Sequence, residues 1–258
     1  MERNLYLVVG TPLSDIGKGW LAGSIASALS SAHLIKIDPV LNPVDFEVND
    51  LTKGMSKMTD AQTYDELGIA FDAEQLFLQG NFLLDFLEAH KAQEVSTHTT
   101  PRLTFSDVAQ YLAQKVCDVF VQSKKADLVI EVGGTVTDPE LSYIPSAIRL
   151  VAARLRANLR IVVLSYLDYS EDQNLSSPIK TRNITYGIEQ TRRIYGEPSL
   201  VFFRRRNLSR AIENNIKAIV DTISIRGLFP KERVIYLPNF ASPTAEREFI
   251  RNFLGICS

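Results

Sequence analysis

Cysteine is scarce in this sequence of 258 residues, which contains only Cys117 and Cys257. Two cysteines so far apart can build neither a disulfide framework nor a thiolate metal cluster, and their scarcity fits a reducing compartment. Histidine is also rare, and His33, His90 and His98 lie in unrelated contexts. The sequence therefore shows no Ser–His–acid or Cys–His arrangement of the kind that activates a protein nucleophile.

An excess of charge of one sign is also missing, because the formal net charge is only −2. A chain without a basic excess is not expected to bind nucleic acid. No apolar run approaches the length that spans a membrane, and the N-terminus passes straight into a predicted strand without the layout of a signal peptide. With no repeat and no linker in view, we expect one cytoplasmic domain over residues 1–258, with no membrane partner.

The most informative stretch that is present runs from Asn4 to Ser31. Leu5 to Val9 is a short apolar run, which is typical of a buried parallel strand. A loop bounded by Gly10 and Gly17–Gly19 follows, and from Trp20 onward the apolar residues recur at helical spacing. This order of strand, glycine-bounded loop and helix opened by Gly-Lys predicts a phosphate-binding loop.

The physical basis is that backbone N–H groups and the positive end of the helix dipole converge on one point, where Lys18 adds a full charge. The spacing departs from the usual motif, since Pro12 stands where a glycine is common and Gly19 where a Ser or Thr is common. Without that hydroxyl, Mg²⁺ would need other ligands. The alternative interpretation is an ordinary strand–turn–helix connection with a solvated lysine.

Further strands alternate with helices along the rest of the chain. Strands are expected at His33–Ile37, Asp127–Val132, Leu159–Leu164, Ser199–Phe203 and Arg233–Leu237, and helices at 72–87, 106–121, 144–155, 184–195 and 242–253. Residues 44–71 are expected to form a long loop with one short helix. The alternation predicts an α/β fold with a doubly wound, mostly parallel sheet and helices on both of its faces, like that of P-loop NTPases and dethiobiotin synthetase.

Glu131 closes an apolar strand and is followed by Gly133 and Gly134. A carboxylate at such a place is costly unless it is paired or bound to a metal ion. Open α/β sheets bind ligands at the carboxyl ends of their strands, and an acid there commonly holds Mg²⁺ beside a phosphate loop. We therefore expect Glu131 to serve the site rather than the packing.

Other charged residues have two interpretations each. Lys36 either faces the phosphates or is a charge at a strand edge, and Asp72 either ligates Mg²⁺ or caps the helix that follows it. Lys180 and Arg182 precede a helix and form either an anion site or a solvated basic turn. Arg204 to Arg206 end a strand, where they either grip phosphate or lie on the surface.

Four segments, in order, resemble the amidoligase (synthetase) domain of CTP synthase. The loop with Ser14 and Gly17-Lys18-Gly19 resembles the family's GGVxSxxGKG, including its unusual spacing. Lys36-Ile37-Asp38-Pro39 is similar to KxDP, and Glu131 to Glu140 is similar to EIGGTVGDIE. Lys180-Thr181-Arg182 resembles the start of KTKPTQ. The resemblance covers nearly the whole chain.

This resemblance implies an ATP- and Mg²⁺-dependent ligase that phosphorylates the 4-oxygen of UTP and replaces it with ammonia. It implies that ATP binds to the loop and that Lys18 and Lys36 are catalytic, while Asp72 and Glu131 hold the metal and the acceptor is bound elsewhere. The loop residues are Ser14, Asp15, Ile16, Gly17, Lys18, Gly19 and Trp20, and the acceptor residues are Asp138, Glu140, Lys180 and Arg182. It also implies a homodimer or homotetramer.

The departures from the family leave rival interpretations open. No glutaminase domain is recognised, so ammonia would come free or from a separate glutaminase. The segment after Ser106 is shorter than in the family, and Asn183 stands where the family has a proline. One rival is a dethiobiotin synthetase-like ligase acting on another small acceptor. The other is a non-catalytic nucleotide sensor or assembly protein that kept only ATP binding.

Overall fold

The computed structural model describes residues 3–11, 17–29, 31–39, 60–97, 103–167, 180–205, 215–240 and 242–255. Within these ranges, seven strands form one sheet in the order β3-β2-β4-β1-β5-β6-β7, and every neighbouring pair is parallel. The strands are β1 (Arg3–Gly10), β2 (Ala32–Asp38), β3 (Leu76–Leu78), β4 (Asp127–Val132), β5 (Ala157–Leu167), β6 (Leu200–Arg205) and β7 (Val234–Tyr236). The expected doubly wound parallel sheet is confirmed.

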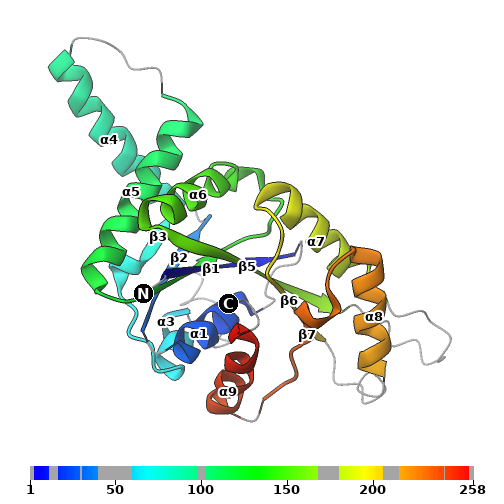
Figure 1. Ribbon diagram of the computed structural model, residues 1–258. Coiled ribbons are helices and arrows are strands. Elements are labelled where there is room, and N and C mark those ends of the chain that lie inside the picture. The colour runs from blue at the N-terminus through cyan, green and yellow to red at the C-terminus, as the bar shows by residue number, and fades with distance from the viewer. Residues whose placement is uncertain are drawn as a thin grey trace, which may run out of the picture.

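Helices cover both faces of this sheet (Figure 1). One face carries α5 (Phe105–Ser123), α6 (Ile144–Leu155), α7 (Arg182–Ile194) and α8 (Ile216–Gly227). The other face carries α1 (Lys18–Ala28), α3 (Asp60–Glu66) and α9 (Pro243–Leu254). The long helix α4 (Gln79–Thr97) projects away from the sheet beside the start of α5 (Figure 1).

Alternating side chains of the strands build two separate cores. In β1, Leu5 and Leu7 pack beneath α5 and α6, whereas Tyr6 and Val8 pack beneath α1. This alternation follows from the pleat of a strand, which sends successive side chains to opposite faces. The same alternation determines which face of the sheet a charged side chain points to when it stands near the carboxyl end of a strand.

Several predicted helix boundaries follow from local chemistry. Ser242 caps α9, because its hydroxyl accepts a hydrogen bond from the Ala245 N–H at 3.3 Å. Thr104 and Asp107 form a capping box at the start of α5. The helix expected over Ile144–Leu155 is found with those bounds.

The helix expected over 72–87 is wrong in its first part. A 3₁₀ turn, η1 (Ala73–Gln75), is followed by the edge strand β3, and α4 begins only at Gln79. The physical reason is tertiary: Leu76 and Leu78 pair with Lys36 and Asp38 of β2, which overrides a local pattern that reads as helical. Of the long loop expected over 44–71, residues 44–59 lie outside the described ranges, and the short helix expected in it is α3.

No helix among the described residues is both long and apolar enough to cross a membrane. Cys117 is a residue of α5, and its side chain is buried in the core.

Candidate functional site

The site is organised by a row of three residues across neighbouring strands near their carboxyl ends. Glu131 of β4 is in register with Val8 of β1 on one side and with Lys36 of β2 on the other. Residues in register on adjacent strands point to the same face. Because Val8 faces α1, Glu131 and Lys36 also face the side of the sheet that α1 and α3 cover. The Glu131 carboxylate and the Lys36 ammonium thus meet beneath the start of α1.

Lys18 is the first residue of α1 and points toward the end of β4. Its ammonium donates a hydrogen bond to the carbonyl oxygen of Gly134 at 2.6 Å, and the residue is only 9% exposed. Gly17 precedes it as the N-cap with a φ of 77°, a left-handed conformation that glycine adopts without strain. Within the described residues, the first turn of α1 has no acidic residue and no capping side chain, so its N–H groups suit an anion.

The pKa of Lys18 is set by its burial and by the charged residues around it. Burial lowers the pKa of Lys18, and the positive charge of Lys36 lowers it further. The carboxylates of Glu131, Asp38 and Asp138 act in the opposite direction and raise the pKa. A lysine that has lost solvation but is surrounded by carboxylates gains from an additional anion, because a phosphate would favour its charged form.

Glu131 and Lys36 are both buried and both have partners. The Glu131 carboxylate accepts a hydrogen bond from the hydroxyl of Tyr64, a fully buried residue of α3. The Lys36 ammonium lies 3.2 Å from Asp38 and 4.0 Å from Glu131, so one cation bridges two carboxylates. Removing one partner of such a buried ion pair strongly destabilises the fold, because the remaining charge is left without compensation.

The glycine-rich turn after β4 brings two segments into close contact. Gly134 has a φ of 68°, and a Cβ atom there would overlap the carboxylate of Asp138. Asp138 in turn accepts hydrogen bonds from the N–H and the hydroxyl of Thr135, at 2.6 and 2.7 Å. Gly134 is therefore explained by the close packing of this turn, and the Asp138 side chain closes the turn.

A pocket of about 390 Å³ lies beside the start of α1. Its lining residues are Trp20, Glu66, Arg204, Pro238, Asn239, Phe240, Ser242, Pro243 and Glu246. Arg204 stands at the carboxyl end of β6, and its Nη1 atom would be 3.3 Å from a Cβ on Gly17. The pocket thus combines an aromatic side chain, an arginine and an amide next to a helix N-terminus.

The expected acceptor residues lie at the same edge but toward the other face. Arg182 begins α7, a helix of the opposite layer, and both Lys180 and Arg182 are exposed. Gly187 of α7 packs against Thr11 at the end of β1, so this helix starts beside the central strand. The backbone of Glu140 belongs to the 3₁₀ turn η2 (Pro139–Leu141).

Of the loop residues expected to bind ATP, Ser14, Asp15 and Ile16 lie outside the described residues, whereas Gly17, Lys18, Gly19 and Trp20 lie inside them.

Asp72 is not brought together with Glu131. It caps η1, where its carboxylate accepts the N–H of Glu74 at 3.0 Å and its own N–H is bonded to the side chain of Gln75. It lies near His33 at the amino end of β2: burial lowers the pKa of His33, and the charge of Asp72 opposes this shift. Asp72 therefore has the capping role that was its alternative interpretation.

Sequence reasoning missed two residues of this site and left a third open. Tyr64 lies in a weakly periodic segment, where nothing in the pattern marks it. Glu246 occupies a helix face with Ile250 and Leu254, and a carboxylate on such an apolar stripe was a usable signal. The role of Arg204 was open, and the structure turns it toward Gly17 rather than to the surface.

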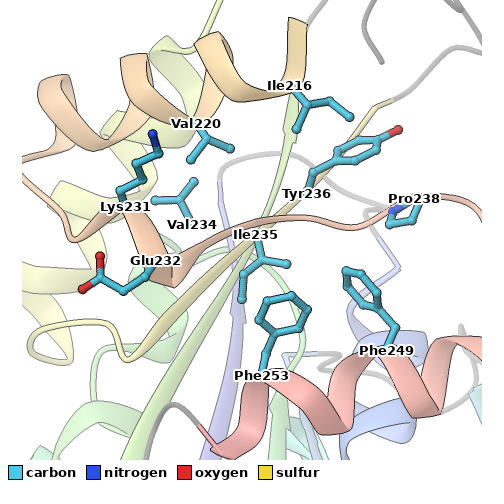
Figure 2. A pocket seen from close by; sticks show the side chains of 10 residues that line it. All are labelled: Ile216, Val220, Lys231, Glu232, Val234, Ile235, Tyr236, Pro238, Phe249 and Phe253. Carbon is cyan, nitrogen blue, oxygen red and sulfur yellow. The ribbon is translucent and has the colours of Figure 1, made fainter. Parts of the chain in front are cut away.

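A second, larger hollow of about 570 Å³ lies at the far edge of the sheet (Figure 2). It is an open groove against β7, between α8 and α9, and its lining is mostly apolar, with Ile235, Phe249 and Phe253 on its walls. Its one lysine, Lys231, is already paired with Asp221. Among the described residues that line it, Lys231 is the only cation, so the groove offers no cationic cluster to a phosphate, and size alone does not identify the site.

Comparison with known proteins identifies the family of the chain. A model of the family described as CTP synthase N-terminus matches residues 4–244. The chain is 25% identical to CTP synthase of Thermosipho africanus over 253 residues, which cover 93% of the chain and 45% of that protein. It is 24% identical to CTP synthase of Helicobacter pylori, covering 86% of the chain and 43% of that protein.

The chain thus spans less than half the length of these curated relatives. Among solved structures, a plasmid partition protein from Borrelia burgdorferi aligns with 99% of the chain and 100% of that protein, at 12% identity and a TM-score of 0.49. The fold assignment itself rests on the parallel sheet and its order. From the family match over nearly its whole length, this chain belongs to the family of CTP synthase N-terminal domains.

Proposed function

We propose that the chain is an ATP- and Mg²⁺-dependent amidoligase that converts the 4-oxo group of UTP, or of a related pyrimidine nucleotide, to an amine. The observation that carries the proposal is Lys18, a buried ammonium at an uncapped helix start, facing Glu131 and Lys36 across the carboxyl edge of the sheet. The family to which the chain belongs supports the reaction type.

ATP is assigned to the α1 side of the sheet. Its phosphates would lie at the N–H groups of the first turn of α1 and at the Lys18 ammonium. Its base and ribose would occupy the adjacent pocket, where Trp20 provides an aromatic wall and Arg204 and Asn239 provide polar groups. The pocket and the helix start are contiguous, which is what a nucleoside triphosphate requires.

The carboxylates near Lys18 could provide some of the oxygen ligands that Mg²⁺ requires. Glu131 and Asp38 are carboxylates that share the Lys36 ammonium, and oxygen ligands are those that Mg²⁺ prefers. No group of three or more acidic, histidine or cysteine side chains is placed to hold a metal within the described parts of the chain. We therefore assign Glu131 as a protein ligand with Asp38 nearby, and the phosphates of ATP as the remaining ligands. Asp72 is left out because it caps η1. The bound ion would neutralise charge on the transferring phosphoryl group.

The acceptor is assigned to the edge of the sheet between the turn at Asp138 and the start of α7. Asp138, Glu140, Lys180 and Arg182 are the proposed contacts to UTP. The γ-phosphoryl group of ATP passes to the uracil 4-oxygen, releasing ADP. Ammonia then adds at C4, inorganic phosphate leaves, and two protons are released from nitrogen. Lys18 and Lys36 supply positive charge and position, and no protein nucleophile is required.

A non-catalytic nucleotide-binding protein is the second candidate, and one observation favours it. Asp72, which the resemblance makes a metal ligand, is at the amino end of the strands and engaged in a cap. A chain that binds ATP but releases no ADP with any pyrimidine nucleotide would have this function.

The direct test is an incubation with ATP, Mg²⁺, UTP and ammonium, followed by the appearance of a cytosine chromophore and of ADP. We expect both products with the wild-type chain. Lys18→Ala should lower turnover by about 10²-fold or more, because it removes the principal charge facing the phosphates. Lys217→Ala is the matched control, since Lys217 is exposed on α8. Wild-type turnover in Lys18→Ala would overturn the proposal.

A further inference from the structure

Glu246 is a buried carboxylate that neither the packing nor the proposed chemistry accounts for. It lies on α9, only 4% exposed, on the same helix face as the apolar Ile250 and Leu254. An acid on such a face is costly to bury unless it is paired. It also lies two residues beyond the part of the chain that the CTP synthase family model matches, which ends at residue 244.

Both oxygens of this carboxylate are used by residues of the nucleotide pocket. Oε1 accepts a hydrogen bond from Nη2 of Arg204 at 2.7 Å, and Oε2 accepts one from Nε1 of Trp20 at 2.5 Å. The two donors come from the carboxyl end of β6 and from the first turn of α1. One side chain of α9 therefore ties together the two elements that flank the pocket.

The geometry leaves the rest of Arg204 directed at the phosphate loop. Its Nη1 atom lies against Gly17, at the start of α1. Its Nε atom is buried and has no hydrogen-bond partner among the described residues. A guanidinium held at Nη2 by Glu246 thus keeps Nη1 against Gly17, in an orientation that a free arginine side chain would seldom hold.

We propose that Glu246 is a positioning residue for nucleotide binding, fixing the Arg204 guanidinium and the Trp20 indole on the wall of the pocket beside the phosphate loop. The inference rests on the proposed ATP site. Pre-organised groups bind more tightly because the ordering of their side chains does not have to be provided at the moment of binding. Without the carboxylate, Arg204 would turn toward another acceptor and the indole would lose its anchor.

The experiment uses Trp20 as its own reporter, because it is the only tryptophan in the sequence. Glu246→Gln keeps the shape of the side chain and removes its charge. We expect it to weaken ATP binding about tenfold, the loss expected for one charge-assisted hydrogen bond of ~1.4 kcal/mol. The turnover number at saturating ATP should stay within about twofold, and the emission maximum of Trp20 without ligand should shift.

The matched control is Glu248→Gln, which removes an exposed carboxylate from the same helix. It should leave both the emission and the ATP affinity unchanged. Glu246→Asp, which keeps the charge but is one methylene shorter, should recover part of the affinity. If Glu246→Gln does not fold, Trp20→Phe and Arg204→Lys give the same test, with the affinity then measured by calorimetry.

The two possible failures are distinguishable. If the wild-type chain does not bind ATP in the presence of Mg²⁺, the proposed function fails and this inference falls with it. If the wild type binds ATP and Glu246→Gln binds it equally well, only the positioning role is overturned. Loss of turnover number without loss of affinity would also overturn it, because it would place Glu246 in the chemical step.

Discussion

Lys18 is the residue on which the account of the site depends, and its charge should make nucleotide binding sensitive to pH. In the free protein, burial lowers its pKa from the ordinary value of 10.5, with Lys36 acting in the same direction and Glu131, Asp38 and Asp138 opposing it. A bound phosphate would raise the pKa again, because it stabilises the ammonium. Binding therefore takes up a proton in the pH range between the two values.

The affinity for ATP should consequently fall as pH rises from neutrality toward 10.5. Titration of the phosphate itself lies near pH ~6, below this range. Calorimetric titration with ATP at several pH values measures the effect. Lys18→Arg, whose guanidinium stays charged, should abolish the pH dependence whatever its absolute affinity. A slope that persists in Lys18→Arg would assign the titration to another group.

Tyr64 is the residue that holds Glu131, and it should matter for both stability and turnover. Tyr64→Phe keeps the buried ring and removes the hydroxyl that donates to the Glu131 carboxylate. We expect the free energy of unfolding in urea to drop by about 1–3 kcal/mol, the cost of losing a buried hydrogen bond to a charged group.

The same change should reduce ATP turnover, because Glu131 loses one of the contacts that orient it. Tyr186→Phe is the control, since Tyr186 is 45% exposed. A Tyr64→Phe protein with wild-type stability and wild-type turnover would show that the contact with Glu131 is incidental.

At the scale of elements, the turn after β4 is the connection that sets the position of Asp138. Gly134→Ala should lower the free energy of unfolding by about 1–3 kcal/mol, since its φ of 68° is strained for alanine and its Cβ would overlap the Asp138 carboxylate. Thermal unfolding followed by circular dichroism measures this. Gly255→Ala, where no atom of the described residues lies within 4 Å of the new Cβ, should leave stability within about 0.5 kcal/mol. Equal stability of the two variants would contradict the packing described for this turn.

The elements that could be predicted from sequence are those whose signal is local. The continuously apolar run of Leu5–Val9 predicted a strand, and residues 242–253 were expected to form a helix. Both elements are found, as β1 and α9. β3 could not be predicted, because its three residues read as part of the following helix and become a strand only by pairing with β2. Tertiary pairing decides such short segments.

The same distinction applies to the candidate site. Lys18 and Glu131 belong to the two most informative stretches of sequence, and the structure brings both to one edge of the sheet. Asp72 kept two interpretations because an acid before a helix has the same local pattern whether it caps or ligates, and the structure shows the cap on η1. Tyr64 and Glu246 act across the fold, through contacts that no local pattern encodes.

On the scale of the whole molecule, the proposed ATP site and the proposed acceptor site lie on opposite faces of the sheet. The layer with α1, α3 and α9 holds the groups assigned to ATP, and the layer with α7 begins beside the groups assigned to the acceptor. Both meet at the carboxyl edge of the central strands, where open α/β sheets bind their ligands. The apolar groove lies against the edge strand β7 (Figure 2) and borders the proposed nucleotide pocket at Pro238, which lines both hollows.

The most direct measurement of the central claim is a crystal structure of the chain with Mg²⁺ and a non-hydrolysable ATP analogue. The account predicts phosphate oxygens within hydrogen-bonding distance of the Lys18 ammonium and of the first N–H groups of α1, with the base beside Trp20 and Arg204. A triphosphate bound elsewhere, or a Lys18 ammonium that keeps its bond to Gly134 and touches no phosphate, would contradict it.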